Sequence, residues 1–280
     1  MTSRYAVRDL IETLDPVRDH WRVHRLTAQV EFPWDVTRAL ELALYRTFAV
    51  PSIAQVLDGT GEFRLRAQKR YDDTALLLAE VLENGYDSAR GRAALSRINR
   101  IHARFPITQE DYRYVLGTFV FVPERWLDRW GWRPLTEVER ESAFLYYRAV
   151  GARMGIRGVP ADRAAFAREF DDYERAHLAP GVPQQRTATA TRELFVSWFP
   201  RPLAPALRPS VHALLDPPLL ESFGFPAPPS WLPVAADRAL RTRAAALRHL
   251  PPRRRPASTA ESRLIRSYPG GWRTEELGPT

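Results

Sequence analysis

Two successive segments of this chain carry apolar residues at helical spacing, and polar side chains interrupt both apolar stripes. In the first segment, Arg70 and Thr74 lie one helical turn apart and share a face with Leu77, Leu78 and Val81. In the second, His102 shares a face with Ala94, Leu95, Ile98, Ile101 and Phe105. Burying a guanidinium, a hydroxyl or an imidazole without a partner costs about 2–7 kcal/mol. The fold must therefore supply partners for three polar groups that face a core.

A haem would supply these partners, since iron binds an imidazole and propionates or dioxygen accept hydrogen bonds from the other two groups. Spacing alone leaves simpler structural roles open. His102 could be a hydrogen-bonded core histidine, and Arg70 could pair with a carboxylate such as Asp73. Thr74 could bond back to its own helix.

Composition and charge exclude several classes of protein. The 280 residues are 45% hydrophobic and 11% aromatic, enough for a sizeable core, and the absence of cysteine excludes disulfides, thiolate metal sites and cysteine nucleophiles. The net charge of +8 comes from arginines that are spread along the chain among acidic residues, with one dense run at 253–255. We therefore expect no nucleic-acid partner. No apolar run approaches the ~20 residues of a membrane-spanning helix, which favours a soluble, cytoplasmic protein.

Helix signals dominate the chain and predict one all-α domain over residues 1–250. From about residue 180 this domain is expected to be looser, and the Pro/Arg-rich tail (251–280) to be poorly ordered or draped over the body. The best strand signal, Phe119 to Val122, is short. The first predicted helix is capped by Asp35, runs through Phe48 and ends before Pro51. The others are Pro51–Leu57, 63–84 with Gly85 as its stop, one from Asp87 or Ser88 to Pro106, one capped by Thr108, one from the Thr136 capping box to Gly155, one from Asp162 to His177, and helical patches near 187–199, 203–215 and 230–250.

Other candidate groups favour structural roles. His20 and His24 have the i,i+4 spacing of a metal pair, but no acidic residue completes a zinc motif, so solvated or core-edge histidines are expected. His24 is also a candidate for lining a haem pocket. The tryptophans Trp126, Trp130 and Trp132 favour core packing over lining an apolar substrate channel. The acidic residues expected on solvated helix faces are Asp171, Asp172, Glu174, Glu137, Glu139 and Glu141. Glu174 and His177 form a single Glu-x-x-His pair, whereas a di-iron site needs two.

The chain resembles the rubber oxygenase and fungal MpaB oxygenase family, which includes the latex-clearing proteins, and it is most similar to the MpaB branch. The resemblance is good over roughly residues 15–180, and a weaker similarity follows between 219 and 255. It rests on Pro51-Ser52-Ile53-Ala54, Lys69-Arg70-Tyr71-Asp72-Asp73-Thr74, Gly85-Tyr86-Asp87-Ser88 with Gly91-Arg92, Ile98-Asn99-Arg100-Ile101-His102, Phe119-Val120-Phe121-Val122-Pro123, Gly131-Trp132-Arg133-Pro134-Leu135-Thr136 and Gly151-Ala152-Arg153-Met154-Gly155-Ile156.

The resemblance implies a globin-like helical core that holds haem b, with His102 as the axial iron ligand. Arg70 and Thr74 match the haem-pocket residues, and the implied reaction is dioxygen-dependent cleavage of a carbon–carbon double bond in an isoprenoid chain. Two departures are evident. Asp73 stands where latex-clearing members have a lysine that can reach the iron, and Glu62 aligns poorly with their proposed catalytic base. In relatives a C-terminal arginine contacts a propionate, and Arg253 is a loosely aligned candidate.

The sequence thus predicts a haem b oxygenase that acts on a small apolar substrate with dioxygen. Arg70 would anchor a propionate or help to polarise dioxygen, and Thr74 would help to set the Arg70 helix. Two alternatives remain. One is a haem protein without oxygenase activity, such as a sensor, carrier or peroxidase-like enzyme. The other is a haem-free helical scaffold.

Overall fold

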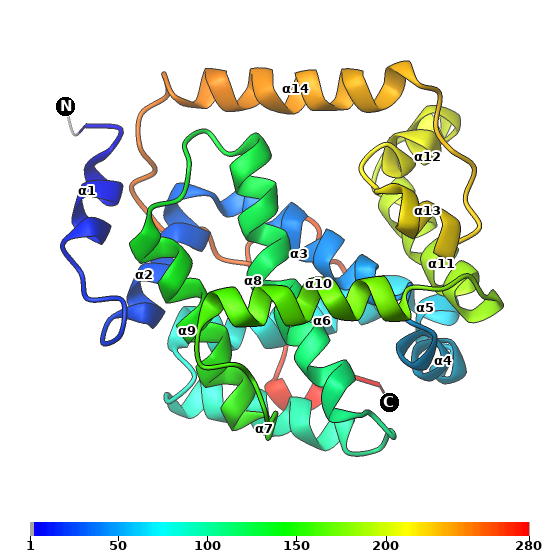
Figure 1. Cartoon of the computed structure of the whole chain (residues 1–280), viewed down its shortest axis with the longest axis horizontal. Helices are drawn as coiled ribbons and strands as arrows, with labels where there is room; N and C mark the ends of the chain where they lie inside the picture. Colours follow the sequence, from blue (N-terminus) through cyan, green and yellow to red (C-terminus); the bar gives the residue numbers. More distant parts are fainter. Residues whose placement is uncertain (1–2, 280) are drawn as a thin grey trace.

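The computed structural model describes residues 3–279, in which every regular element is a helix (Figure 1). The all-α prediction is confirmed, and the globin-like detail stays a prediction. Helix α8 runs through the centre of the body, with α3 and α9 packed against it. The elements are α1 (Ala6–Glu12), α2 (His20–Leu26), the π-helix η1 (Thr27–Glu31), α3 (Pro33–Thr47), α4 (Pro51–Thr60), α5 (Glu62–Leu65), α6 (Ala67–Asn84), α7 (Ala89–His102), α8 (Gln109–Trp130), α9 (Glu137–Arg153), α10 (Arg163–His177), α11 (Val182–Ser197), the 3-10 helix η2 (Arg201–Leu203), α12 (Ala204–His212), α13 (Pro217–Ser222), α14 (Trp231–Leu247) and the 3-10 helix η3 (Thr274–Glu276).

Side-chain caps begin four of these helices where the sequence predicts them. Ser88, Thr108 and Asp162 each accept a hydrogen bond from a backbone N–H in the first turn of α7, α8 and α10. Thr136 and Glu139 form the predicted reciprocal capping box of α9. These bonds satisfy N–H groups that have no partner within the helix, which explains why the starting residues were predictable.

Three local predictions are wrong for identifiable reasons. Asp35 is not a cap but a buried residue in the first turn of α3, where it accepts from Trp126 Nε1 (3.2 Å) and pairs with Arg243 (2.9 Å). The expected helix 63–84 is broken at Arg66, whose φ of −141° leaves the helical region and separates α5 from α6. The strand signal at 119–122 lies inside α8, because burial in a helix core also selects apolar and β-branched residues.

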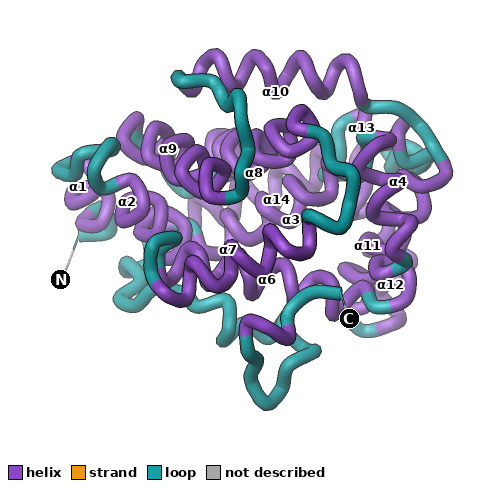
Figure 2. The backbone as a smooth tube through the Cα atoms, turned by 90° about the horizontal axis from the view of Figure 1, so that it is seen from below, coloured by secondary structure: helices purple, strands orange, loops and turns teal. Residues whose placement is uncertain are grey.

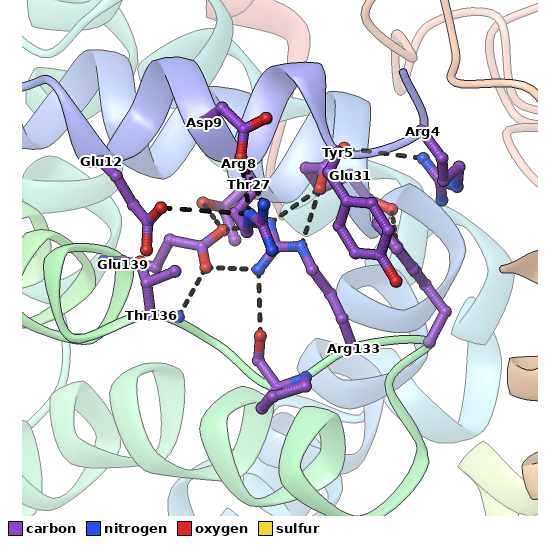
Figure 3. A network of polar contacts seen from close by, with 12 residues as sticks. Arg4, Tyr5, Arg8, Asp9, Glu12, Thr27, Glu31, Arg133, Thr136 and Glu139 are labelled. Carbon is purple, nitrogen blue, oxygen red and sulfur yellow. Dashed lines mark hydrogen bonds and ion pairs between the residues drawn. The ribbon is translucent and has the colours of Figure 1, made fainter.

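Two of the acidic residues expected on solvated faces are buried instead. Glu174 accepts from Arg46 (2.6 Å) and from the Tyr114 hydroxyl (2.9 Å). Glu139 forms an ion pair with Arg133, which also pairs with Glu31. One guanidinium thereby joins the 131–136 loop to η1 and α9 (Figure 3). Each of these carboxylates is paired with arginine, which is the condition under which a charge is tolerated in a core.

The predicted packing role of the tryptophans is confirmed. Trp126, Trp130 and Trp132 are buried in one cluster with apolar residues of α3. Trp132 Nε1 donates to the Glu31 carbonyl (3.1 Å), so this ring is both packed and hydrogen-bonded. The cluster lies under α14, which crosses the top of the body in Figure 1.

The segment after Pro251 is draped over the helix pair α6 and α7. Its backbone N–H groups at Arg266 and Ser267 donate to Asp72, and the Tyr268 hydroxyl donates to Asp73 (2.5 Å). At the far end Leu277 is buried in the main core, and Lys69 donates to the Gly278 carbonyl (2.8 Å). The C-terminus therefore lies beside the α6–α7 pair (Figure 2).

Candidate active site

A tight turn between α6 and α7 brings Arg70 and His102 to the same end of a helical hairpin. Gly85 ends α6 with φ of 85°, a conformation that favours glycine. A Cβ on Gly91 would lie 2.0 Å from the Gly85 carbonyl oxygen, so the turn needs glycine there as well. Because the two helices pack side by side in opposite directions, the first turn of α6 meets the last turn of α7.

His102 is partly buried and its ring lacks the partners of an ordinary core histidine. Nδ1 is buried without a hydrogen bond, and within residues 3–279 neither ring nitrogen has a partner. The Tyr112 ring lies 5.7 Å from the imidazole, centroid to centroid. Burial, followed by the nearby Arg70 cation, lowers the pKa of His102 to about 4. The imidazole is therefore neutral near pH 7, with a lone pair free to bind a metal.

Arg70 and Thr74 bind each other at the start of α6. Arg70 Nη1 donates to Thr74 Oγ1, which in turn donates to the Arg70 carbonyl (2.9 Å), so Thr74 does bond back to its own helix. The possible Arg70–Asp73 pair is not formed, because Asp73 binds Lys69 (2.9 Å) and Tyr268. Burial lowers the pKa of Arg70, and within the described chain no carboxylate pairs with it.

The donor set of this site fits a haem. A deeply set guanidinium without a carboxylate suits a propionate, and an imidazole without a hydrogen bond suits the iron. Opposite the hairpin, Tyr112, Val115 and Phe119 lie on one face of α8 and stay partly exposed, although all three pack against the main core. These three side chains form the apolar surroundings of His102 on the α8 side.

The structure adds a buried acid that the sequence analysis did not single out. Glu41 of α3 accepts from the Tyr71 hydroxyl (2.7 Å) and pairs with Arg38 (2.7 Å). Burial raises the pKa of Glu41 to about 7, although Arg38 opposes this shift. The only sequence signal was a glutamate among the leucines of α3. Phe63 was also missed, and its ring lies 5.5 Å from the Arg70 guanidinium.

Several sequence candidates are occupied elsewhere. Glu62 pairs with Arg66, which holds the pKa of Glu62 below its usual value. His20 shares a hydrogen bond with Tyr86 (2.5 Å), whereas His24 is buried between two other tyrosines, so the two histidines do not form a metal pair. Arg253 is exposed. No cluster of three potential metal-binding side chains occurs among the residues that the structure describes.

Comparison with known proteins assigns the family. The profile described as "ER-bound oxygenase mpaB/B'/Rubber oxygenase, catalytic domain" matches residues 13–249, which is most of the chain. The chain belongs to this family. The resemblance stated from the sequence motifs is therefore confirmed, and the similar curated proteins are of the mpaB branch.

The relatives are fungal proteins named as oxygenases. The chain is 28% identical over 261 residues to the ER-bound oxygenase mpaB' of Penicillium brevicompactum, an alignment that covers 86% of this chain and 61% of the relative. It is 28% identical over 203 residues to the ER-bound oxygenase mpaB of Penicillium roqueforti (strain FM164), covering 66% of this chain and 68% of the relative. The chain thus spans about three fifths of the mpaB' relative. In the part of the chain described, no helix is long and apolar enough to cross a bilayer.

Proposed function

We propose that this protein is a haem b-dependent oxygenase that cleaves a carbon–carbon double bond in an isoprenoid or other unsaturated apolar substrate. The observation that carries the proposal is an imidazole without a hydrogen bond beside a guanidinium without a carboxylate partner, at one end of the α6–α7 hairpin. Membership of the mpaB/rubber oxygenase family supports the reaction class.

Each residue of the trio has one task in this proposal. His102 would offer a ring nitrogen to the iron, because burial keeps the imidazole neutral. Arg70 offers its remaining N–H donors to a propionate, and Thr74 fixes the direction of the guanidinium through their hydrogen bond. A haem held through a neutral imidazole would supply the dioxygen chemistry.

The apolar face of α8 is the proposed site for the unsaturated chain. Tyr112 and Phe119 lie two turns apart on that face, and Phe119 stacks on Tyr147 of α9 (5.6 Å). Such aromatic walls bind an apolar chain by burying its surface, at roughly 25 cal/mol for each Å² removed from water. They also exclude water from the reacting double bond.

Substitution of His102 tests the cofactor role. We expect His102→Ala to keep the helical far-ultraviolet spectrum and to lose the Soret absorption that the wild type has after haemin titration. The matched control is His177→Ala, since His177 lies on the exposed end of α10. A His102→Ala protein that still holds one haem per chain contradicts the assignment.

One observation favours a second candidate, a haem protein without oxygenase activity. Glu62 is held by Arg66, so the acidic residue nearest to the family's proposed base is already paired. Oxygen uptake distinguishes the two functions. Haem-loaded protein should consume dioxygen when given a polyene, and uptake equal to that of free haemin would favour a sensor or carrier.

A further inference from the structure

A second group of polar side chains without partners lies between α2 and α9. His24 is 7% exposed and its Nε2 is buried without a hydrogen bond. Ser142 is fully buried, and its hydroxyl oxygen also has no partner. The bond from Thr27 Oγ1 to Glu139 (3.0 Å) ties the end of α2, where η1 begins, to the first turn of α9. Ser142 and Tyr146 follow about one and two turns further along α9.

Two tyrosines complete this group. The His24 ring stacks on Tyr146 at 4.6 Å and meets Tyr147 edge-on at 5.1 Å, centroid to centroid. Both tyrosines are buried, and burial raises the pKa of each hydroxyl. Neither hydroxyl has a hydrogen-bond partner within residues 3–279. Two buried atoms on the facing helices, His24 Nε2 and Ser142 Oγ, therefore lack partners beside these hydroxyls, and burying an unpaired polar group is unfavourable.

One face of α8 connects this group with the proposed haem site. Tyr147 stacks on Phe119, and Tyr112 lies on the same face of α8, seven residues earlier and beside His102. Seven residues of α-helix span about 10 Å, at 1.5 Å per residue. An extended apolar chain along this face would connect the two ends.

The chemistry of the group selects its ligand. Burial lowers the pKa of His24 to about 3, with His20 adding to the effect, so the imidazole is uncharged near pH 7. The two tyrosines and the serine are neutral hydroxyls that both donate and accept. Uncharged donors and acceptors suit an alcohol or a carbonyl. A carboxylate or a phosphate would lack the cation that its burial requires.

We propose that His24, Ser142, Tyr146 and Tyr147 form a subsite for an uncharged oxygen-bearing group at one end of the substrate. The inference rests on the proposed function for the other end of the molecule, where the double bond would approach the haem. The substrate is then an amphiphile, an unsaturated chain with a terminal alcohol or carbonyl, and not a plain hydrocarbon. The subsite would discriminate against a hydrocarbon, because a ligand without the terminal oxygen leaves the polar groups of the subsite unpaired.

A binding comparison tests the proposal without relying on turnover. Calorimetric titration of the purified full-length protein, at its recorded haem content, compares farnesol with the hydrocarbon farnesene. We expect the alcohol to bind at least about tenfold more tightly, the equivalent of about one hydrogen bond. Farnesoate, the ionised acid, should bind more weakly than farnesol.

Variants locate the effect. Tyr147→Phe removes one oxygen atom, and His24→Phe removes both ring nitrogens; each should reduce farnesol binding towards that of farnesene and leave farnesene binding unchanged. His177→Phe makes the same exchange on the exposed end of α10 and should change neither. Equal affinities for alcohol and hydrocarbon in the wild type, or equal weakening of both ligands by Tyr147→Phe, would overturn the proposal and leave bound water as the partner of the group. Selective binding by a colourless protein would keep the subsite and refute the haem proposal.

Discussion

Removing Arg133 should destabilise the fold strongly, and the size of the effect follows from its contacts. The guanidinium is 4% exposed and makes four bonds of 2.7–2.9 Å to the carboxylates of Glu31 and Glu139, whose side chains are 0% exposed. Arg133→Met would leave the buried Glu139 without its cation and Glu31 with only the longer contact to Arg4 (3.7 Å). Breaking a buried pair in this way costs about 3–5 kcal/mol. That is a large part of the roughly 5–15 kcal/mol that stabilises a typical domain.

The destabilisation should also depend on pH, with a definite sign. Burial already raises the pKa of Glu31, and removal of the Arg133 cation would raise the pKa of this carboxyl group further. A folded-state pKa above the unfolded value gives stability that is present at low pH and lost as the pH rises through the folded pKa. The free-energy difference between Arg133→Met and wild type should therefore be smaller at pH 5 than at pH 7.5.

Urea unfolding followed by tryptophan fluorescence measures both effects. Arg125→Met is the matched control, because the Arg125–Asp171 pair lies about half exposed on the surface and should contribute about 0–1 kcal/mol. A loss below about 1 kcal/mol for Arg133→Met, or a loss that is the same at both pH values, would refute the account of this network.

Three further predictions concern the site and the tail. Burial lowers the pKa of His24 to about 3, so between this value and about pH 6.5 the unfolded chain binds a proton that the folded chain does not. The free energy of unfolding should therefore fall by about 2–3 kcal/mol between pH 6.5 and 4.5. In urea unfolding, His24→Phe should remove this part of the pH dependence. Arg70→Gln should weaken haemin binding in a spectrophotometric titration while leaving the helical content unchanged, since it removes a cation that no carboxylate pairs with. Asp73→Asn should loosen the C-terminal segment, because Tyr268 and Lys69 then lose the carboxylate that they bind. Limited proteolysis should show faster cleavage after residue 251, and unchanged cleavage would contradict the role given to Asp73.

Local signals in the sequence predicted much of the helical architecture. Ser88, Thr108 and Thr136 mark helix starts because the capping bond forms between residues three apart, so the information is local. Helical spacing indicated the polar residues of the two apolar stripes, and Gly85 marked the end of α6, whereas the packing of α6 against α7 was not predicted. Asp35 failed as a predicted cap because its partners, Trp126 and Arg243, lie far away in the sequence.

The polar groups that lie in the interior were the least predictable. Glu139 and Glu174 lie in helical segments with the sequence pattern of solvated acidic faces. Their burial is explained only by ion pairs with Arg133 and Arg46, which belong to other elements. His24 likewise gave a weak signal in sequence, as half of an i,i+4 pair. The burial of its unpaired Nε2 follows only from the packing of α9 against α2.

The most direct test of the central claim is an ultraviolet–visible spectrum of the purified protein before and after dithionite, with a pyridine haemochrome assay. The account predicts a Soret band and about one b-type haem per chain, bound through a neutral His102. A colourless protein that takes up no added haemin would contradict it, and would leave a helical protein of this family whose polar trio serves another ligand.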